Sequence, residues 1–136
     1  MSTGAEGTVI DTSCWIEAMR ERGDDTIRRR VGELLENGEA RFTDMVRLEL
    51  YNGPGGADER RFLHQLEELV ETIPTTVQVW LEARALAGQA RDHGVTVPAT
   101  DVLVFATARV HGLELLHRDV HFDRLAEVVD GHQRVS

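Results

Sequence analysis

Four short apolar segments constrain the fold of this chain more than any other feature. They are Val9-Ile10, Ala40–Thr43, Val70–Ile73 and Leu113–Leu116. One or two stretches with the periodicity of amphipathic helices separate each segment from the next. Strands joined through helices cannot form hairpins, so we expect these strands to be parallel. The pattern predicts an α/β fold in which helices cover a parallel sheet of four or five strands.

Capping residues and glycines indicate where the helices begin and end. Expected helices cover residues 14–22, 45–51, 76–93 and 101–111, and a clearer one is capped by Asp24 or Asp25 and ends at Gly38. Asp44 and Thr100 are suitable N-caps for the helices that follow them. After the fourth strand, we expect one helical turn over Phe122–Ala126 and a fifth strand at Val128-Val129. Ligands of such sheets gather beyond the carboxyl ends of the strands, so any chemistry is expected at that edge.

The charged residues exclude several classes of protein. The net charge of −9 argues against broad electrostatic binding to nucleic acid, unless divalent cations neutralise some of the acids. All 15 basic residues are arginine. Without lysine, the chain cannot form a Walker-type phosphate loop, a Schiff base, or a receiver domain of the usual kind.

The remaining composition bounds the domain organisation. Cys14 is the single cysteine, which excludes an internal disulfide and fits a reducing, cytoplasmic setting. No apolar run approaches the ~18 residues of a membrane span, so we expect no membrane association. The N-terminal MSTGAEG lacks the regions of a signal peptide. We expect one domain over residues 1–136, with flexible ends at 1–7 and 131–136.

Four of the 24 acidic residues stand beside apolar neighbours: Asp11, Glu49, Asp101 and Asp119. Asp11 and Asp119 follow the first and fourth expected strands, and therefore lie at the same edge of a parallel sheet. Taken singly, Asp11 and Asp101 have a structural explanation, because aspartate suits helix starts. Glu49 lies between two leucines within a helix, where it caps nothing.

Taken together, the four acids predict a metal site. Two carboxylates 4 Å apart repel by about 4 kcal/mol at an effective dielectric constant of 20. Oxygen-only ligands of this kind suit Mg²⁺ or Mn²⁺. No nucleophile–base pair is apparent, since neither Ser13 nor Cys14 has a local histidine. Metal-assisted phosphodiester hydrolysis is therefore the leading chemistry.

Four stretches, in this order, resemble the PIN-domain ribonucleases, and among them the VapC-type toxins of bacterial toxin–antitoxin modules. They are VIDTSCWIE, LELYNG, VPATDVLVFATAR and LLHRDVHFDRLA, and the resemblance covers nearly the whole chain. It implies a three-layer α/β/α fold, a homodimer, and endonucleolytic cleavage of RNA that depends on Mg²⁺ or Mn²⁺. It also implies a partner, an antitoxin whose tail covers the groove of the toxin.

The resemblance assigns roles to particular residues. Asp11, Glu49, Asp101 and Asp119 match the acidic quartet that binds metal and catalyses, and Ser13 matches the supporting hydroxyl beside the first acid. One departure is His121, which stands where relatives often carry an acid or an asparagine and puts a second metal site in doubt. Whether His121 or the nearby Asp123 contributes to the site stays open.

The two tryptophans and the function each leave alternatives. Trp15 is either a contact for the antitoxin or a core residue, and Trp80 is expected in the core or in a dimer interface. A catalytically silent PIN-like binding or dimerisation module is the second functional hypothesis. A phosphatase that forms an aspartyl phosphate is disfavoured, because Ser13 replaces the usual second acid and the chain has no lysine.

Overall fold

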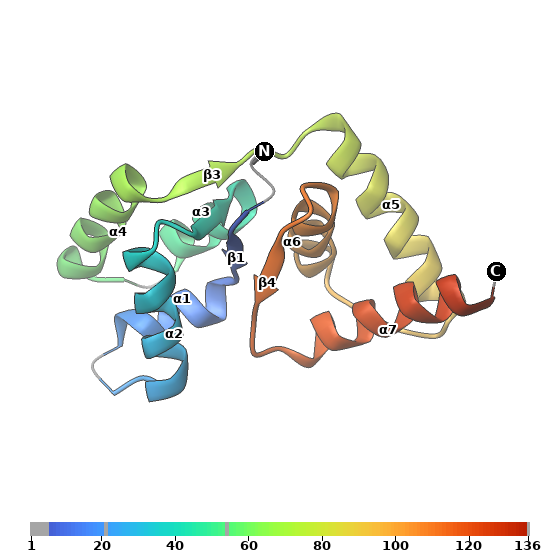
Figure 1. Cartoon of the computed structure of the whole chain (residues 1–136), viewed down its shortest axis with the longest axis horizontal. Coiled ribbons are helices and arrows are strands. Elements are labelled where there is room, and N and C mark those ends of the chain that lie inside the picture. Colours follow the sequence, from blue (N-terminus) through green and yellow to red (C-terminus); the bar gives the residue numbers. More distant parts are fainter. Residues whose placement is uncertain (1–5, 21, 54, 136) are drawn as a thin grey trace.

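A computed structural model describes residues 6–20, 22–53 and 55–135, with side chains through residue 130, and in this part of the chain seven helices surround four strands (Figure 1). The strands are β1 (Thr8–Ile10), β2 (Ala40–Thr43), β3 (Glu71–Ile73) and β4 (Glu114–Leu116). The helices are α1 (Thr12–Met19), α2 (Asp25–Glu36), α3 (Asp44–Asn52), α4 (Ala57–Leu69), α5 (Val77–Asp92), α6 (Ala99–Val110) and α7 (Val120–Val135).

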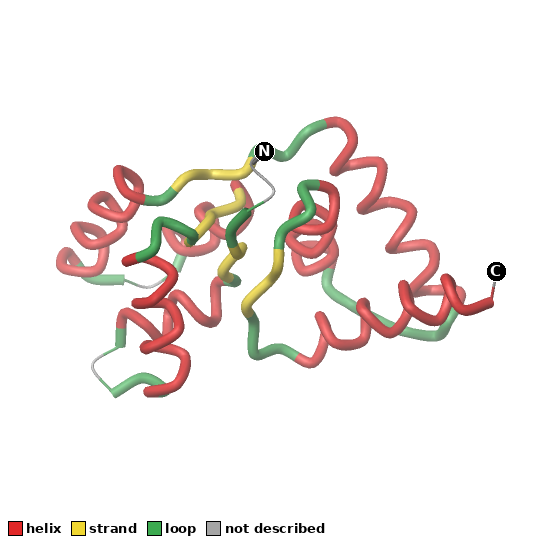
Figure 2. Tube along the Cα trace, in the orientation of Figure 1, coloured by secondary structure: helices red, strands yellow, loops and turns green. Residues whose placement is uncertain are grey.

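The four strands form one parallel sheet in the order β3-β2-β1-β4. Val9 in β1 pairs with Arg41 of β2 on one side and with Leu115 of β4 on the other. The chain therefore builds outward through β2 and β3, then passes through α5 and α6 before β4 joins the opposite side of β1 (Figure 2). The strand order reverses between β1 and β4, and such a switch point is where parallel sheets bind ligands.

The predicted α/β fold with a parallel, helix-covered sheet is confirmed, with four strands in the described residues. The segment Ala40–Thr43 was predicted with the observed bounds, and the longest predicted helix corresponds to α5. Gly38, Gly94 and Gly112 each follow a helix and have φ between 68° and 72°, the left-handed conformation that glycine adopts without strain. These glycines set the ends of α2, α5 and α6.

Two predictions near the C-terminus were wrong. Val128 and Val129 belong to α7 rather than to a fifth strand, and the single turn expected at 122–126 is part of the same helix. Phe122, Leu125 and Val129 are all buried, at the i, i+3, i+7 spacing of a helix face. The helix continues to Val135, through the segment where the sequence suggested a flexible tail. Residues 1–5 of the expected flexible N-terminus lie outside the described residues.

Two predicted caps were also wrong. The hydroxyl of Thr43, not the carboxylate of Asp44, accepts a hydrogen bond from the backbone N–H of Val46 and caps α3. The Asp44 carboxylate instead accepts hydrogen bonds from the backbone and hydroxyl of Thr75. Helix α6 begins at Ala99, one residue before Thr100, and it has no side-chain cap.

The burial of the two tryptophans distinguishes between the alternatives predicted for each. Trp15 is fully buried and packs on Phe42, with ring centroids 4.9 Å apart, so it is a core residue rather than a surface for a partner. Trp80 is 48% exposed on α5, which excludes the core and leaves the dimer interface as the other predicted alternative. None of the helices in the described part of the chain combines the length and the apolar character that crossing a membrane requires.

Candidate metal centre

Asp11 lies at the carboxyl end of β1, where it begins α1. Its carboxylate Oδ2 accepts a hydrogen bond from the Ser13 hydroxyl at 3.0 Å and a longer one, 3.5 Å, from the Ser13 backbone N–H. Its own backbone N–H donates to the carbonyl oxygen of Leu116, the last residue of β4, at 3.0 Å. The side chain is buried, with 6% of the residue exposed. Asp11 thus joins the two strands that flank the switch point.

Asp119 has the equivalent position after β4. Its carboxylate Oδ1 accepts a hydrogen bond from the backbone N–H of His121 at 2.9 Å and caps the start of α7. Its own backbone N–H donates to Nδ1 of His117 at 3.3 Å. A strand, an aspartate and a helix start therefore occur twice at this edge of the sheet, once around Asp11 and once around Asp119.

The structure places Asp101, Asp119 and His121 together. Nδ1 of His121 lies 3.1 Å from Oδ2 of Asp101, in the first turn of α6, and 3.1 Å from Oδ1 of Asp119. One potential ligand atom from each of the three residues lies within 4.8 Å of the others. All three side chains are half-buried, so the cluster is open to solvent on one side.

Burial and neighbouring acids disfavour a negative charge on Asp101. Burial raises the pKa of the Asp101 carboxyl, and the nearby Asp119 and Asp11 carboxylates raise it further, while His121 lowers it. Asp11 acts on Asp101 in this way although its carboxylate is not one of the three clustered ligands. The two carboxylates and the imidazole of the cluster fit the donor set of a divalent metal ion, which would relieve the repulsion between the acids.

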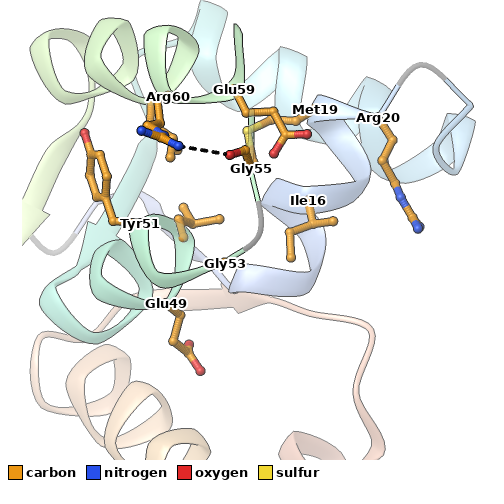
Figure 3. A pocket seen from close by; sticks show the side chains of 11 residues that line it. Ile16, Met19, Arg20, Glu49, Tyr51, Gly53, Gly55, Glu59 and Arg60 are labelled. Atoms are coloured by element: carbon orange, nitrogen blue, oxygen red, sulfur yellow. Dashed lines mark hydrogen bonds between the residues drawn. The ribbon is translucent and has the colours of Figure 1, made fainter. Parts of the chain in front are cut away.

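Glu49 lies outside that cluster of three. Its carboxylate Oε1 accepts a hydrogen bond from the hydroxyl of Thr12, the first residue of α1, at 2.7 Å. In Figure 3 the side chain extends away from its neighbours, toward the faint orange ribbon of the C-terminal part of the chain. This hydrogen bond of Glu49 joins α3 to the start of α1. Its partner, Thr12, is the residue that directly follows Asp11.

Glu49 is also at the end of a groove between α1, α3 and α4, with a volume of about 280 Å³ (Figure 3). Its apolar lining comes from Ile16, Met19, Leu50 and Leu63, and its charged lining from Arg20, Glu59 and Arg60. The side chain of Arg60 lies across one part of the groove, and its Nη2 donates to the carbonyl oxygen of Gly55 at 3.5 Å. The groove thus leads from an apolar surface to one of the four predicted site acids.

His121 is the site residue that sequence reasoning left undecided, and Thr12 is one that it missed. The signal for His121 was its position two residues after Asp119, because an aspartate that caps a helix bonds the N–H of that residue. Thr12 directly follows Asp11, but nothing in the sequence connects it to Glu49, 37 positions away. Asp123, the other undecided residue, is 69% exposed and faces His117 rather than the cluster.

The fold and the cluster define a class: an α/β protein with a carboxylate site at the switch point of a parallel sheet. Residues 8–128 match the family model of the PIN domain. The chain is 32% identical over 130 residues to the VapC ribonuclease Mb1587 of Mycobacterium bovis, covering 90% of this chain and 93% of that protein. The chain therefore belongs to the PIN-domain family.

Solved structures give the same fold at lower sequence identity. VapBC-1 from nontypeable Haemophilus influenzae aligns with a TM-score of 0.70 and 22% identity, covering 88% of this chain and 92% of that chain. A toxin–antitoxin complex from Klebsiella pneumoniae aligns with a TM-score of 0.67 and 17% identity, covering 84% and 88%. At these identities the likeness supports the fold alone.

Proposed function

We propose that this protein is a metal-dependent endoribonuclease that acts as the toxin of a toxin–antitoxin pair. The observation that carries the proposal is the cluster of Asp101, Asp119 and His121 at the switch point. The charge of Asp11 contributes to the raised pKa of Asp101 in this cluster. The name of the Mycobacterium bovis relative, a VapC ribonuclease, supports RNA as the substrate. A cytoplasmic location is part of the same proposal, since that is where such a toxin meets RNA.

The residues of the chain have distinct parts in the proposed reaction. A bound Mg²⁺ or Mn²⁺ supplies Lewis-acid activation of the phosphodiester and of water. Asp11, Asp101 and Asp119 are the residues that would hold this ion, and Glu49 brings a fourth carboxylate from α3. Ser13 keeps the Asp11 carboxylate in place through the 3.0 Å hydrogen bond to Oδ2. Thr12 does the same for Glu49.

RNA-end sequencing after brief expression tests this function. Wild-type protein should generate new RNA ends at defined positions, and Asp11→Asn should generate none although the protein stays folded. Purified protein should lose cleavage in EDTA and regain it when Mg²⁺ or Mn²⁺ is added in excess. Undiminished cleavage in EDTA would contradict the metal mechanism. A folded wild-type protein without any cleavage would instead favour the silent binding module.

The groove between α1, α3 and α4 is the proposed site for the antitoxin. Its apolar lining suits the apolar side of a peptide segment, and Glu49 at its end offers a carboxylate to a basic side chain of that segment. A peptide lying there would reach the edge of the acidic cluster. The structural neighbour from Klebsiella pneumoniae is a toxin–antitoxin complex by its title, which supports a protein partner of this kind.

A second apolar surface supports the proposed homodimer. On α5, Val77 is 77% exposed, Trp80 48% and Leu81 47%. Beside Trp80, a cavity of about 330 Å³ lies between α5 and the start of α6, lined by Met45, Ala83, Ala99 and Leu103 among others. Contiguous exposed apolar side chains of this kind mark protein interfaces. We therefore assign the α5–α6 surface to contact with a second copy of the chain.

A further inference from the structure

We propose that His121 is a direct ligand of the metal ion, through Nδ1, and that this nitrogen shifts the preference of the site from Mg²⁺ toward Mn²⁺. The inference rests on the metal centre of the proposed function. It goes beyond that function because it assigns a ligand atom and a metal preference that the function does not specify.

The position of the imidazole carries the proposal. Nδ1 of His121 lies 3.1 Å from a carboxylate oxygen of Asp101 and 3.1 Å from one of Asp119. Adjacent ligands of an octahedral ion with bonds of about 2.1 Å are separated by about 3.0 Å. The nitrogen therefore lies at the spacing of adjacent ligands from each of the two oxygens, and one potential ligand atom from each of the three residues lies within 4.8 Å of the others.

The backbone keeps the imidazole at this place. The N–H of His121 donates to Oδ1 of Asp119 at 2.9 Å, so the residue belongs to the capped first turn of α7. The side chain is 31% exposed, between the 16% of Asp101 and the 36% of Asp119. A ligand held by a helix start needs little ordering when an ion binds, which favours coordination.

The neighbouring histidine does not compete for this role. Nδ1 of His117 accepts a hydrogen bond from the backbone N–H of Asp119, and its ring packs on Phe122 with centroids 4.9 Å apart. Its Nε2 faces Asp123 at 3.7 Å. Within the described residues, the three-residue ligand cluster includes His121 and not His117.

The identity of the donor atom determines the selectivity. Mg²⁺ is a hard ion that prefers oxygen and gives up water reluctantly, whereas imidazole nitrogen suits transition metals. Replacing one oxygen ligand by imidazole should therefore strengthen binding of Mn²⁺ relative to Mg²⁺. A histidine that only donated a hydrogen bond to Asp101 and Asp119 would keep its proton and produce no such preference.

Electron spin-echo spectroscopy of bound Mn²⁺ tests coordination without any variant. Wild-type protein loaded with one equivalent of Mn²⁺ should show nuclear modulation from a coordinated imidazole nitrogen, and the pattern should change when the histidines carry ¹⁵N. In His121→Asp the nitrogen signal should disappear while Mn²⁺ still binds. A wild-type spectrum without nitrogen modulation, or a signal that persists in His121→Asp, would overturn the proposal.

Calorimetric titration of each ion measures the selectivity. The ratio of Mn²⁺ to Mg²⁺ affinity should fall about tenfold or more from wild type to His121→Asp. Loss of a residue that only orients a ligand already weakens metal binding by about tenfold, and loss of a direct ligand should have at least this effect. His93→Asp, which makes the same charge change at the far end of α5, should leave the ratio unchanged. An unchanged ratio in His121→Asp contradicts the proposal.

RNA cleavage, measured in parallel, separates this inference from the proposed function. Metal-dependent cleavage with no nitrogen signal would overturn the role of His121 and leave the ribonuclease intact. Absence of both cleavage and metal binding in folded wild-type protein would overturn both.

Discussion

The hydroxyl of Thr12 donates a hydrogen bond of 2.7 Å to the carboxylate of Glu49, and this contact connects the first turn of α1 to α3. Thr12 follows Asp11, the acid directly after β1. These two adjacent residues therefore contribute one carboxylate of the site and the hydroxyl that binds the carboxylate of Glu49. The orientation of Glu49 thus depends on the strand–helix junction and not on α3 alone.

Replacing Thr12 by valine should release Glu49 while conserving side-chain volume. We expect the free energy of unfolding to fall by about 1 kcal/mol, the net contribution of such a hydrogen bond, and RNA cleavage to decrease. Urea denaturation and an RNA cleavage assay measure the two effects. Thr26→Val, at an exposed position in the first turn of α2, should change neither. Wild-type cleavage by Thr12→Val would show that the contact does not position Glu49.

Asp101→Asn should abolish cleavage and yet stabilise the metal-free protein at neutral pH. The pKa of Asp101 is raised on folding from its ordinary value of 3.8, so the folded protein loses stability as this carboxyl ionises at higher pH. Asparagine removes that charge. We expect cleavage to fall about a hundredfold or more.

Chemical denaturation in EDTA across pH 3.5–8 measures this linkage. The stability advantage of Asp101→Asn should be smallest at the acid end of this range, where the carboxyl of the folded wild type is protonated, and should grow as pH rises through the folded pKa. Asp92→Asn, at an exposed acid at the end of α5, serves as the control. A variant that is less stable than wild type at pH 7 without metal would contradict the repulsion described here.

Ile16→Asp should weaken inhibition by the antitoxin without weakening RNA cleavage by the free toxin. Ile16 is 41% exposed in the groove between α1, α3 and α4, so an acid there places a charge in an apolar contact. The dissociation constant for the purified antitoxin should rise about tenfold or more. Leu69→Asp, at an exposed position at the end of α4 outside the lining of the groove, should bind as wild type does. Equal affinities of Ile16→Asp and wild type for the antitoxin would show that the antitoxin binds outside this groove.

Trp80→Asp should dissociate the proposed homodimer and leave the fold of each subunit intact. Trp80 is exposed beside the cavity at α5 and α6, so the substitution affects association rather than the core. Analytical ultracentrifugation should show a dimer for wild type and for Leu69→Asp, and a monomer for Trp80→Asp at micromolar concentration. A dimeric Trp80→Asp would exclude this surface as the interface.

The fold could be predicted because its signals are local. Strand β2 and helix α5 each lie between clear end signals, so their bounds needed no knowledge of tertiary contacts. Helix α7 was missed because Val128-Val129 are β-branched residues that favour strands, whereas the tertiary packing of Phe122, Leu125 and Val129 required a helix.

The site could be predicted only in part. The positions of Asp11 and Asp119 at one edge follow from the parallel strands, whose carboxyl ends must coincide. The contact of His121 with Asp101 could not be predicted, because it depends on where α7 begins and on the direction of one ring. The exposure of Trp80 could not be predicted either, since the buried stripe on α5 runs through Val79, Ala83, Leu86 and Ala90 and just misses it.

The pairing of β1 with β4 has a consequence for the protein during its synthesis. Thr8 pairs with Glu114, so the first strand completes its hydrogen bonding only after more than a hundred residues have followed it. A ribosome-bound chain that has not yet exposed α7 has neither Asp119 nor His121 available at the sheet edge. At about 5–20 residues per second, this interval lasts for several seconds at least. The cluster of Asp101, Asp119 and His121 can therefore form only when almost the whole chain has emerged from the ribosome.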